Sequence, residues 1–219
     1  MTAGSNALYN FKHIFTNRKF EKFFPKLSYE NDKDIRYAYK GGFTYLNPIY
    51  KEIDVGRGTI LDVNSLYPSV MYEKLLPIGD GVFFEGEYKE DKIYPLYIQR
   101  IICCFKIKKN KIPTIQIKNN RQYFRENEYL ESSNGEIVAL TLTNIDLKLF
   151  FENYDVEDLK FICGWKYKGM TGLFTEYIDH WISIKNEATL SGNYAMRTLA
   201  KLMLNSLYRK ICHFHGYTK

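Results

Sequence analysis

The spacing of hydrophobic residues in the last third of the chain predicts helices. Apolar residues recur at three- and four-residue intervals from Leu173 to about Tyr208, which is the pattern of an amphipathic helix. Ser191 and Gly192 interrupt the pattern, because both residue types favour turns over helix interiors. We therefore predict two antiparallel helices joined by a short turn.

Two other segments have the same helical spacing. LTNIDLKLFFENY, at 142–154, has Thr143 or Asn144 as its N-cap, since both residue types cap helices well. Near the N-terminus a helix-compatible stretch spans 11–24, where Pro25 halts it. These segments predict one helix in the middle of the chain and one at its start.

The region between about 74 and 167 differs from its flanks, because short apolar runs alternate there with turn signals. PLYIQRIICCFKIK and IPTIQI are typical of strands, and SSNG at 132–135 is typical of a turn. Together with the helix at 142–154 these runs predict a separate inserted α+β subdomain.

The segment GTILDVNSLYPSV, at 58–70, predicts a strand followed at once by a helix. Its apolar positions 60, 61 and 63 favour a buried strand that ends near Asp62 to Ser65. Pro68 can stand in the first turn of the helix, where its missing N–H costs nothing. A tight Gly-Gly bend in YKGGFTYLNP precedes this segment.

Composition adds a bias toward an anionic partner. The 219 residues are 45% hydrophobic, enough for a globular core, and 31 Lys and Arg against 25 Asp and Glu give a formal charge of +6. No acidic residue follows Glu187, whereas several basic residues do: Arg197, Lys201, Arg209, Lys210 and Lys219. The alternative is an ordinary solvated basic helix face.

Other sequence features exclude whole classes of protein. The N-terminus lacks a signal-peptide pattern and no apolar run could span a bilayer, so we expect a soluble, cytoplasmic protein without a membrane partner. The four cysteines form no CxxC pair, which predicts reduced thiols. Cys212, His213 and His215 lack a second ligand pair at suitable spacing, so we expect no zinc site.

Asp62 is the first residue whose position indicates chemistry. A carboxylate at a strand end before a sharp turn projects into a cleft, and Mg²⁺ prefers carboxylate, carbonyl, phosphate and water oxygens. The backbone carbonyl of Val63 could join Asp62 at such a metal, and the ring of Tyr67 could press against a sugar and exclude a 2′-hydroxyl. Alternatively, Asp62 only forms a turn and Tyr67 only fills a core.

The second candidate site is one face of the last predicted helix. At about 100° per residue, one sector collects polar and aromatic side chains: Arg197, Lys201, Asn205 and Tyr208. The opposing apolar stripe contains Met196, Leu199, Met203 and Leu207, although Leu204 lies near the polar sector. Two cations one turn apart can meet a triphosphate, and an aromatic ring can stack on a base pair. An amphipathic surface helix would explain the stripe equally well.

Both segments resemble motifs of the family B DNA polymerases. DVNSLYPSVM, at 62–71, is similar to motif A, D-x-x-S-L-Y-P, and KLMLNSLY, at 201–208, is similar to motif B, K-x-x-x-N-S-x-Y. The resemblance implies that Asp62 is a catalytic metal ligand and that Tyr67 discriminates against ribose. It implies that Lys201 contacts the phosphates of the incoming nucleotide and that Tyr208 contacts the nascent base pair.

The resemblance assigns roles to further residues. Lys185, in WISIKNEA, resembles a second phosphate-contacting lysine, and Ser65 and Asn205 would position template and base pair. Arg197 would add positive charge near the DNA. RYAYKGGFTYLN resembles the Y-x-G-G motif of the protein-primed polymerases of small Bacillus phages and related mobile elements. The matching residues, which would touch single-stranded template, are Tyr39, Gly41 and Gly42.

The resemblance also implies an architecture. We expect an α+β fragment of a family B polymerase: a partial palm at 1–73, an inserted subdomain that contacts a terminal protein at 74–167, and a helical fingers hairpin with a divergent tail at 168–219. The implied reaction is template-directed nucleotidyl transfer in protein-primed, phage-type DNA replication in a bacterial host. The implied partners are template and primer DNA, deoxynucleoside triphosphates and a terminal protein, with Mg²⁺ or Mn²⁺ as cofactor.

This sequence departs from the family pattern in several places. We find neither the 3′–5′ exonuclease domain nor the later YxDTDS motif, Arg209 stands where the pattern has glycine, and ICHFHGYTK no longer follows the family. A two-metal site needs further carboxylates, so we expect the chain to be inactive alone. The alternative is a non-catalytic remnant of a split polymerase gene that binds DNA or a terminal protein, with or without a complementary polymerase fragment.

Overall fold

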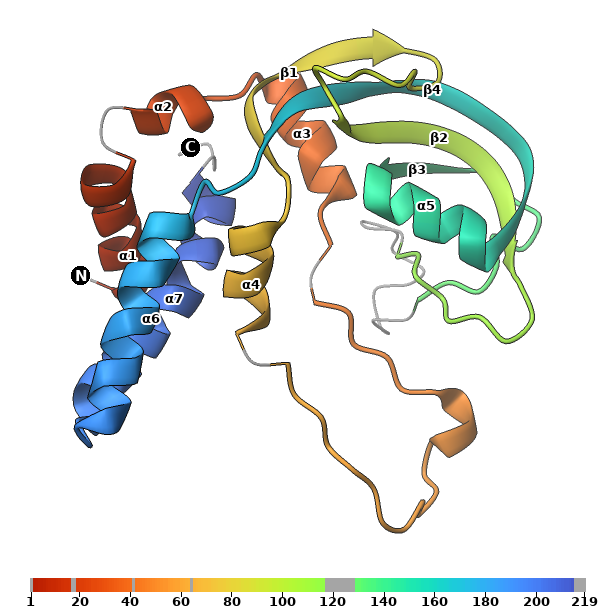
Figure 1. The fold of residues 1–219 in the computed structure, drawn as a ribbon. Coiled ribbons are helices and arrows are strands. Elements are labelled where there is room, and N and C mark those ends of the chain that lie inside the picture. Colours follow the sequence, from red (N-terminus) through yellow and green to blue (C-terminus); the bar gives the residue numbers. More distant parts are fainter. Residues whose placement is uncertain (1, 17–18, 41, 64, 117–128, 215–219) are drawn as a thin grey trace. The chain divides into compact units, whose positions relative to one another are not determined.

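The computed structural model describes residues 2–16, 19–40, 42–63, 65–116 and 129–214 (Figure 1). Its contacts divide the chain into two compact units, each assembled from stretches that are far apart in sequence. The first comprises Met1–Leu27, Asp62–Asp80 and Lys168–Lys219, and the second comprises Ser28–Leu61 and Gly81–Tyr167.

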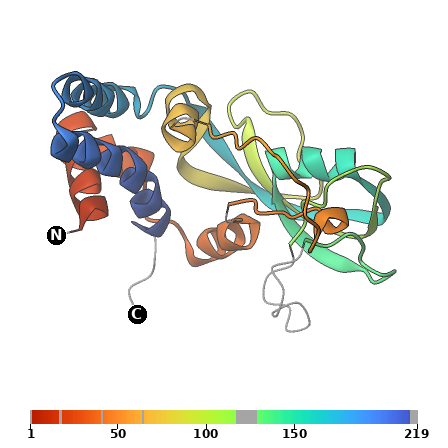
Figure 2. The ribbon, with the colours of Figure 1, turned by 90° about the horizontal axis from the view of Figure 1, so that it is seen from below.

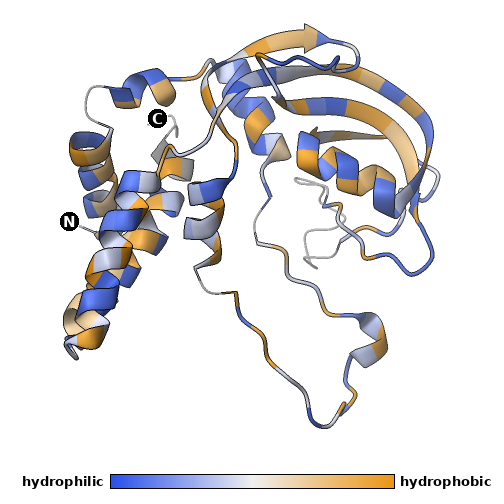
Figure 3. Ribbon diagram, in the orientation of Figure 1, coloured by the Kyte–Doolittle hydropathy of each residue, from blue (hydrophilic) through white to orange (hydrophobic). Residues whose placement is uncertain are grey.

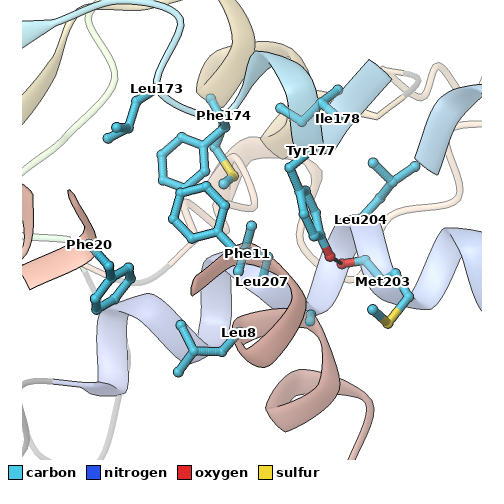
Figure 4. Close-up of a cluster of buried hydrophobic side chains, with 12 residues drawn as sticks. Leu8, Phe11, Phe20, Leu173, Phe174, Tyr177, Ile178, Met203, Leu204 and Leu207 are labelled. Atoms are coloured by element: carbon cyan, nitrogen blue, oxygen red, sulfur yellow. Dashed lines mark hydrogen bonds between the residues drawn. The ribbon is translucent and has the colours of Figure 1, made fainter. Parts of the chain in front are cut away.

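The first unit is a set of helices around one hydrophobic core. Its elements are α1 (Ala3–Asn10), the π-helix η1 (Phe11–Phe15), α2 (Phe20–Phe23), α4 (Leu66–Glu73), α6 (Thr175–Leu190) and α7 (Tyr194–Phe214). Phe11, Tyr177 and Leu207 lie at the centre of the core, where Phe11 stacks on Phe174 with ring centroids 4.7 Å apart (Figure 4). Because α1, α4, α6 and α7 all contribute to this core, it holds helices from both ends of the chain together.

The α6–α7 hairpin forms because a three-residue turn reverses the chain. Gly192 adopts a φ of +69°, a backbone conformation that residues with a Cβ atom rarely adopt. The side-chain oxygen of Asn193 then accepts a hydrogen bond from the backbone N–H of Met196 and caps the first turn of α7. The two predicted helices and the break near Ser191 and Gly192 are confirmed.

The second unit is built on the four-stranded sheet. The strand order is β1 (Leu76–Glu85), β4 (Tyr154–Met170), β2 (Leu96–Ile107), β3 (Val138–Thr143), and β2 pairs antiparallel with both β3 and β4. Register shifts interrupt the β2–β4 pairing after Arg100 and after Ile102. Such irregularities bend strands, and the sheet is strongly curled (Figures 1 and 2).

Two helices pack on this sheet, α3 (Tyr29–Ala38) and α5 (Asn144–Asn153), and a single 3₁₀ turn, η3 (Pro48–Tyr50), lies in the connecting segment. Thr143 is the N-cap of α5, as predicted: its hydroxyl oxygen accepts a hydrogen bond from the backbone N–H of Asp146. The core between α5 and the sheet is centred on Ile101, Phe150 and Tyr154.

The predicted α+β class is confirmed, and so is a strand over most of PLYIQRIICCFKIK. Other predictions were wrong. The stretch 11–24 is a π-helix and a short α-helix rather than one helix, and of IPTIQI only Ile115 forms a bridge, to Leu130, among the described residues. The long strand β4 was not predicted. The two contact units are interleaved in sequence, so the domain boundaries after 73 and 167 stay a prediction.

Candidate functional site

The two candidate motifs meet in the first unit through a pair of aromatic rings. Tyr67 on α4 stacks on Tyr208 on α7, with ring centroids 4.6 Å apart and planes inclined by 25°. Behind this pair, Met71 of α4 is buried in the same core as Met203 and Leu207 of α7. The fold therefore places the aromatic residues of motifs A and B side by side.

A strained turn directs the chain into α4. Ser65 precedes the helix with φ +54° and ψ +41°, the left-handed conformation that residues other than glycine seldom adopt. Its carbonyl accepts the backbone N–H of Ser69, so the first helical turn closes on Ser65. Pro68 lies in this first turn, as predicted, and the structure shows that it is buried. Asn64, between Ser65 and the acid of motif A, lies outside the described residues.

The segment before this turn is not the buried strand that we predicted. It forms no regular secondary structure (Figure 3). Its apolar side chains are largely exposed, with Ile60 at 98% and Leu61 at 89%. A buried strand needs neighbours that pair its backbone N–H and C=O groups, and no strand within the described residues pairs with 60–63. Asp62 and Val63 are therefore exposed rather than held in a cleft.

Helix α7 separates its polar and buried faces much as predicted, with one shift. Arg197, Lys201 and Asn205 are exposed on one side, and Tyr208 is half-buried at the end of that row. The buried stripe follows i, i+3, i+4, i+7: Ala200, Met203, Leu204 and Leu207. Met196 and Leu199, which we placed on the stripe, are 40% and 42% exposed, and Leu204, which we placed near the polar sector, is 3% exposed. The buried stripe is centred on Ala200, so it is rotated around the helix by part of a turn from the stripe that we predicted.

Helix α6 carries Lys185, which is half-buried, and contacts α7 along its length. Tyr177, at 1% exposure, donates a hydrogen bond of 2.8 Å to the backbone carbonyl of Met203 (Figure 4). Burial raises the pKa of Tyr177, so its hydroxyl is a permanent donor. Because Met203 lies between Lys201 and Asn205, this bond fixes the register of motif B against α6.

Sequence reasoning missed a polar contact between α4 and α6. The negative charge of the Asp179 carboxylate on α6 raises the pKa of Tyr72 on α4. Tyr72 follows Tyr67 by little more than one helical turn, so this interaction lies on the helix that carries Tyr67. Only the proximity of Tyr72 to motif A could have drawn attention to it.

The Y-x-G-G segment belongs to the second unit. Tyr39 follows the last residue of α3 in extended conformation and is 49% exposed, and Gly42 is exposed as well. Gly41 lies outside the described residues. The fold therefore does not bring this segment into the same compact unit as Asp62 and Lys201.

Within the ranges that the structure describes, no three His, Cys, Asp or Glu side chains gather closely enough to hold a metal ion. The side chains of Cys212, His213 and His215 are not among those that the structure describes. The described helices include none with the length and apolar character needed to cross a bilayer.

Comparisons with known proteins identify the family. The model of the family "DNA polymerase type B, organellar and viral" matches residues 1–210. The DNA polymerase of Bacillus phage phi29 is 54% identical over 210 residues, which are 96% of this chain and 36% of that protein. The DNA polymerase of Streptococcus phage Cp-1 is 36% identical over 222 residues, covering 95% of this chain and 37% of that protein.

Solved structures agree with the sequence comparison. Phi29 DNA polymerase complexed with primer-template DNA and incoming nucleotide substrates superimposes with a TM-score of 0.88 at 53% identity, covering 95% of this chain and 36% of that chain. Its complex with primer-template DNA alone gives a TM-score of 0.89 at 52% identity. The chain thus spans little more than a third of the length of these relatives. Because the family model matches nearly all of it, the chain belongs to the type B DNA polymerases of organelles and viruses.

Proposed function

We propose that this chain supplies the nucleotide-binding part of a DNA polymerase that carries out template-directed synthesis in protein-primed, phage-type replication. The observation that supports this most directly is the stack of Tyr67 on Tyr208, because it unites motifs A and B in one compact unit. In this arrangement one ring faces the sugar of an incoming nucleotide and the other faces its base pair. Stacking on aromatic rings stabilises bases without selecting among them.

Phosphate binding is assigned to the cationic side of the fingers hairpin. Lys201 and Arg197 are exposed one turn apart on α7, and Lys185 is half-buried on the neighbouring α6. No acidic residue follows Glu187 in the sequence, so no carboxylate of α7 competes with a triphosphate for these cations. Charge-assisted hydrogen bonds from such cations to phosphate oxygens are stronger than neutral ones. Ser65 and Asn205 would then position template and base pair. We assign contact with single-stranded template to the Y-x-G-G segment, Tyr39 to Gly42.

Asp62 fits a single divalent cation better than a complete two-metal site. Its carboxylate is exposed, and Mg²⁺ readily takes one protein carboxylate together with phosphate oxygens and water. Asp62 and the carbonyl of Val63 would hold Mg²⁺ or Mn²⁺, which when bound neutralises charge on the nucleotide phosphates. The described residues offer no acidic cluster for a second metal beside it. We therefore propose that catalysis requires further carboxylates beyond those of the described residues.

Equilibrium binding of a deoxynucleoside triphosphate with Mg²⁺ tests the nucleotide site. Lys201→Met should weaken binding about tenfold or more, since a hydrogen bond to a charged group contributes about 1.5–3 kcal/mol. Lys210→Met is the matched control, because it removes the same charge from the opposite side of the same helix, about two and a half turns further along, next to Gly4. Equal effects of the two substitutions would contradict the assignment.

A second candidate function is a non-catalytic module that binds DNA or a terminal protein. The exposure of Asp62 and its apolar neighbours Ile60 and Leu61 favours it, since this segment has no fixed environment within the described part of the chain. Primer extension by the purified chain, alone and with an added polymerase fragment that carries the YxDTDS motif, separates the candidates. Nucleotide incorporation that Asp62→Ala abolishes supports the enzyme, whereas salt-sensitive DNA binding without incorporation supports the module.

A further inference from the structure

The lysine in the middle of the Y-x-G-G segment points into the second unit. Lys40 Nζ donates to the backbone carbonyl of Thr114 at 3.1 Å and to Oδ1 of Asp146 at 3.1 Å. Its side chain is only 19% exposed and that of Asp146 only 24%. Lysine is almost never buried without a partner, because its ammonium loses hydration that other contacts must replace. These contacts tie the segment to residues 74 and 106 positions later in the chain.

The aspartate that receives Lys40 is itself held in place. The hydroxyl of Thr143 donates to Oδ2 of Asp146 at 2.7 Å, so both carboxylate oxygens have a partner. Asp146 also lies in the first turn of α5, where the helix dipole favours a negative charge. Asp146 is therefore a fixed anchor for Lys40.

The residues on either side of Lys40 show what this anchor does to the segment. Tyr39 is extended, with φ −65° and ψ 129°, and successive side chains of an extended chain point in opposite directions. With Lys40 turned inward, Tyr39 is turned outward and is 49% exposed. Beyond the glycine pair, the ring of Phe43 lies 4.6 Å from the ring of Tyr129. The segment is thus attached to the inserted subdomain both before its glycines, through Lys40, and after them, through Phe43.

We infer that Lys40 is a positioning residue for single-stranded DNA rather than a phosphate contact. Through Asp146 and Thr114 it holds the Y-x-G-G segment so that Tyr39 and Gly42 face a template strand. The inference rests on the proposed function in one respect, the assignment of template binding to this segment. The Lys40 ammonium acts inside the protein, on Thr114 and Asp146. Through these contacts the inserted subdomain determines the conformation of the Y-x-G-G segment.

Binding of a fluorescein-labelled single-stranded oligothymidylate, measured by anisotropy over a range of salt concentrations, tests the inference. Asp146→Asn is the decisive variant, because it removes a negative charge. If only overall charge mattered, this variant would bind DNA more tightly. We expect it to bind about fivefold more weakly, as does Lys40→Met, since contacting residues commonly couple by about 1 kcal/mol. Lys40→Arg should bind like the wild type.

Lys166→Met is the matched control. It breaks the ion pair with Asp91 in the same unit, with both side chains 25% exposed, and it lowers the net charge as Lys40→Met does. Its effect on DNA affinity should be less than about twofold, because it leaves the Y-x-G-G segment anchored.

Three results would overturn the inference. The first is Asp146→Asn binding DNA as tightly as the wild type or more tightly. The second concerns the slope of the logarithm of DNA affinity against the logarithm of salt concentration. A slope that is smaller by about one for Lys40→Met than for the wild type would make Lys40 a direct phosphate contact. The third needs no DNA: hydrogen exchange at the amides of Tyr39 and Phe43 that is no faster in Asp146→Asn. A wild-type chain that binds no oligonucleotide would instead refute the template-binding part of the proposed function, and the exchange experiment would still decide whether Lys40 positions the segment.

Discussion

The hydroxyl of Tyr177 reaches from α6 to the backbone carbonyl of Met203 in the middle of motif B, at a distance of 2.8 Å. Around it, the ring of Tyr177 packs edge-on against Phe11 and Phe15, with centroids 6.0 and 5.3 Å away. Helix α7 cannot slide or rotate against α6 without breaking this bond inside the core. The side chains of the motif therefore have a fixed register.

Tyr177→Phe should destabilise the protein without changing its fold, because it removes the hydroxyl and keeps the ring. We expect the free energy of unfolding to fall by about 1 kcal/mol, the usual net contribution of such a bond. Urea denaturation monitored by circular dichroism measures it. An unchanged midpoint would mean that the bond adds nothing to stability.

Tyr67→Val should reduce discrimination between deoxynucleotides and ribonucleotides. Removing the ring opens space where a 2′-hydroxyl would otherwise collide, so the ratio of the two dissociation constants should move toward one. Binding of dATP and ATP to wild type and variant gives this ratio. Tyr208→Phe is the control, since it retains the stacking surface; a variant ratio equal to that of the wild type would show that Tyr67 does not face the sugar.

Asp179→Asn should lower the pKa of Tyr72, because the carboxylate raises it mainly through its negative charge. Deprotonating Tyr72 beside Asp179 places two negative charges together, and the amide removes that repulsion. NMR of ring-labelled tyrosine, assigned with Tyr72→Phe, follows the titration. A Tyr72 pKa that is unaffected by the substitution would exclude the contact between α4 and α6.

The Asp91–Lys166 pair should make stability depend on pH in acid. Lys166 Nζ lies 2.7 Å from Asp91 Oδ2, and its hydrogen bond holds the pKa of Asp91 below its usual value. A carboxyl with a lowered folded-state pKa stabilises the protein above its unfolded pKa of about 3.9, and this contribution is lost as the pH falls through the folded value. Unfolding free energies of wild type and Asp91→Asn should therefore converge as the pH falls from neutral through this range. Curves that stay parallel would contradict the prediction.

The helices of the site could be predicted from the sequence because their periodicity is local. For α7 the pattern gave the correct side for Arg197, Lys201 and Asn205. It misplaced Met196 and Leu199 because alanine carries little hydrophobic weight, although Ala200, at 0% exposure, is the centre of the buried face. The stack of Tyr67 on Tyr208 could not be predicted by periodicity, since it depends on how two distant helices pack.

The segment at 60–63 shows the opposite case. Its hydrophobic residues indicate that the segment is suited to burial, but hydrophobicity does not specify what would cover it. Strand formation depends on a hydrogen-bonding neighbour, which is a non-local property. The strand β4 was missed for the same reason. It contains many polar residues, and it forms a strand because it pairs with β1 on one side and β2 on the other.

The left-handed backbone of Ser65 has a consequence for which residue suits this position. Glycine would adopt φ +54° at lower conformational cost, whereas serine in this region is held at a cost of about 1 kcal/mol or more. Backbone conformation therefore does not explain the serine, and its side chain makes no capping hydrogen bond to α4. The role that we propose for its hydroxyl is to position the template. Replacing it with glycine would relieve the strain and remove the hydroxyl in one step, so that a loss of template binding without a loss of stability would be the signature of that use.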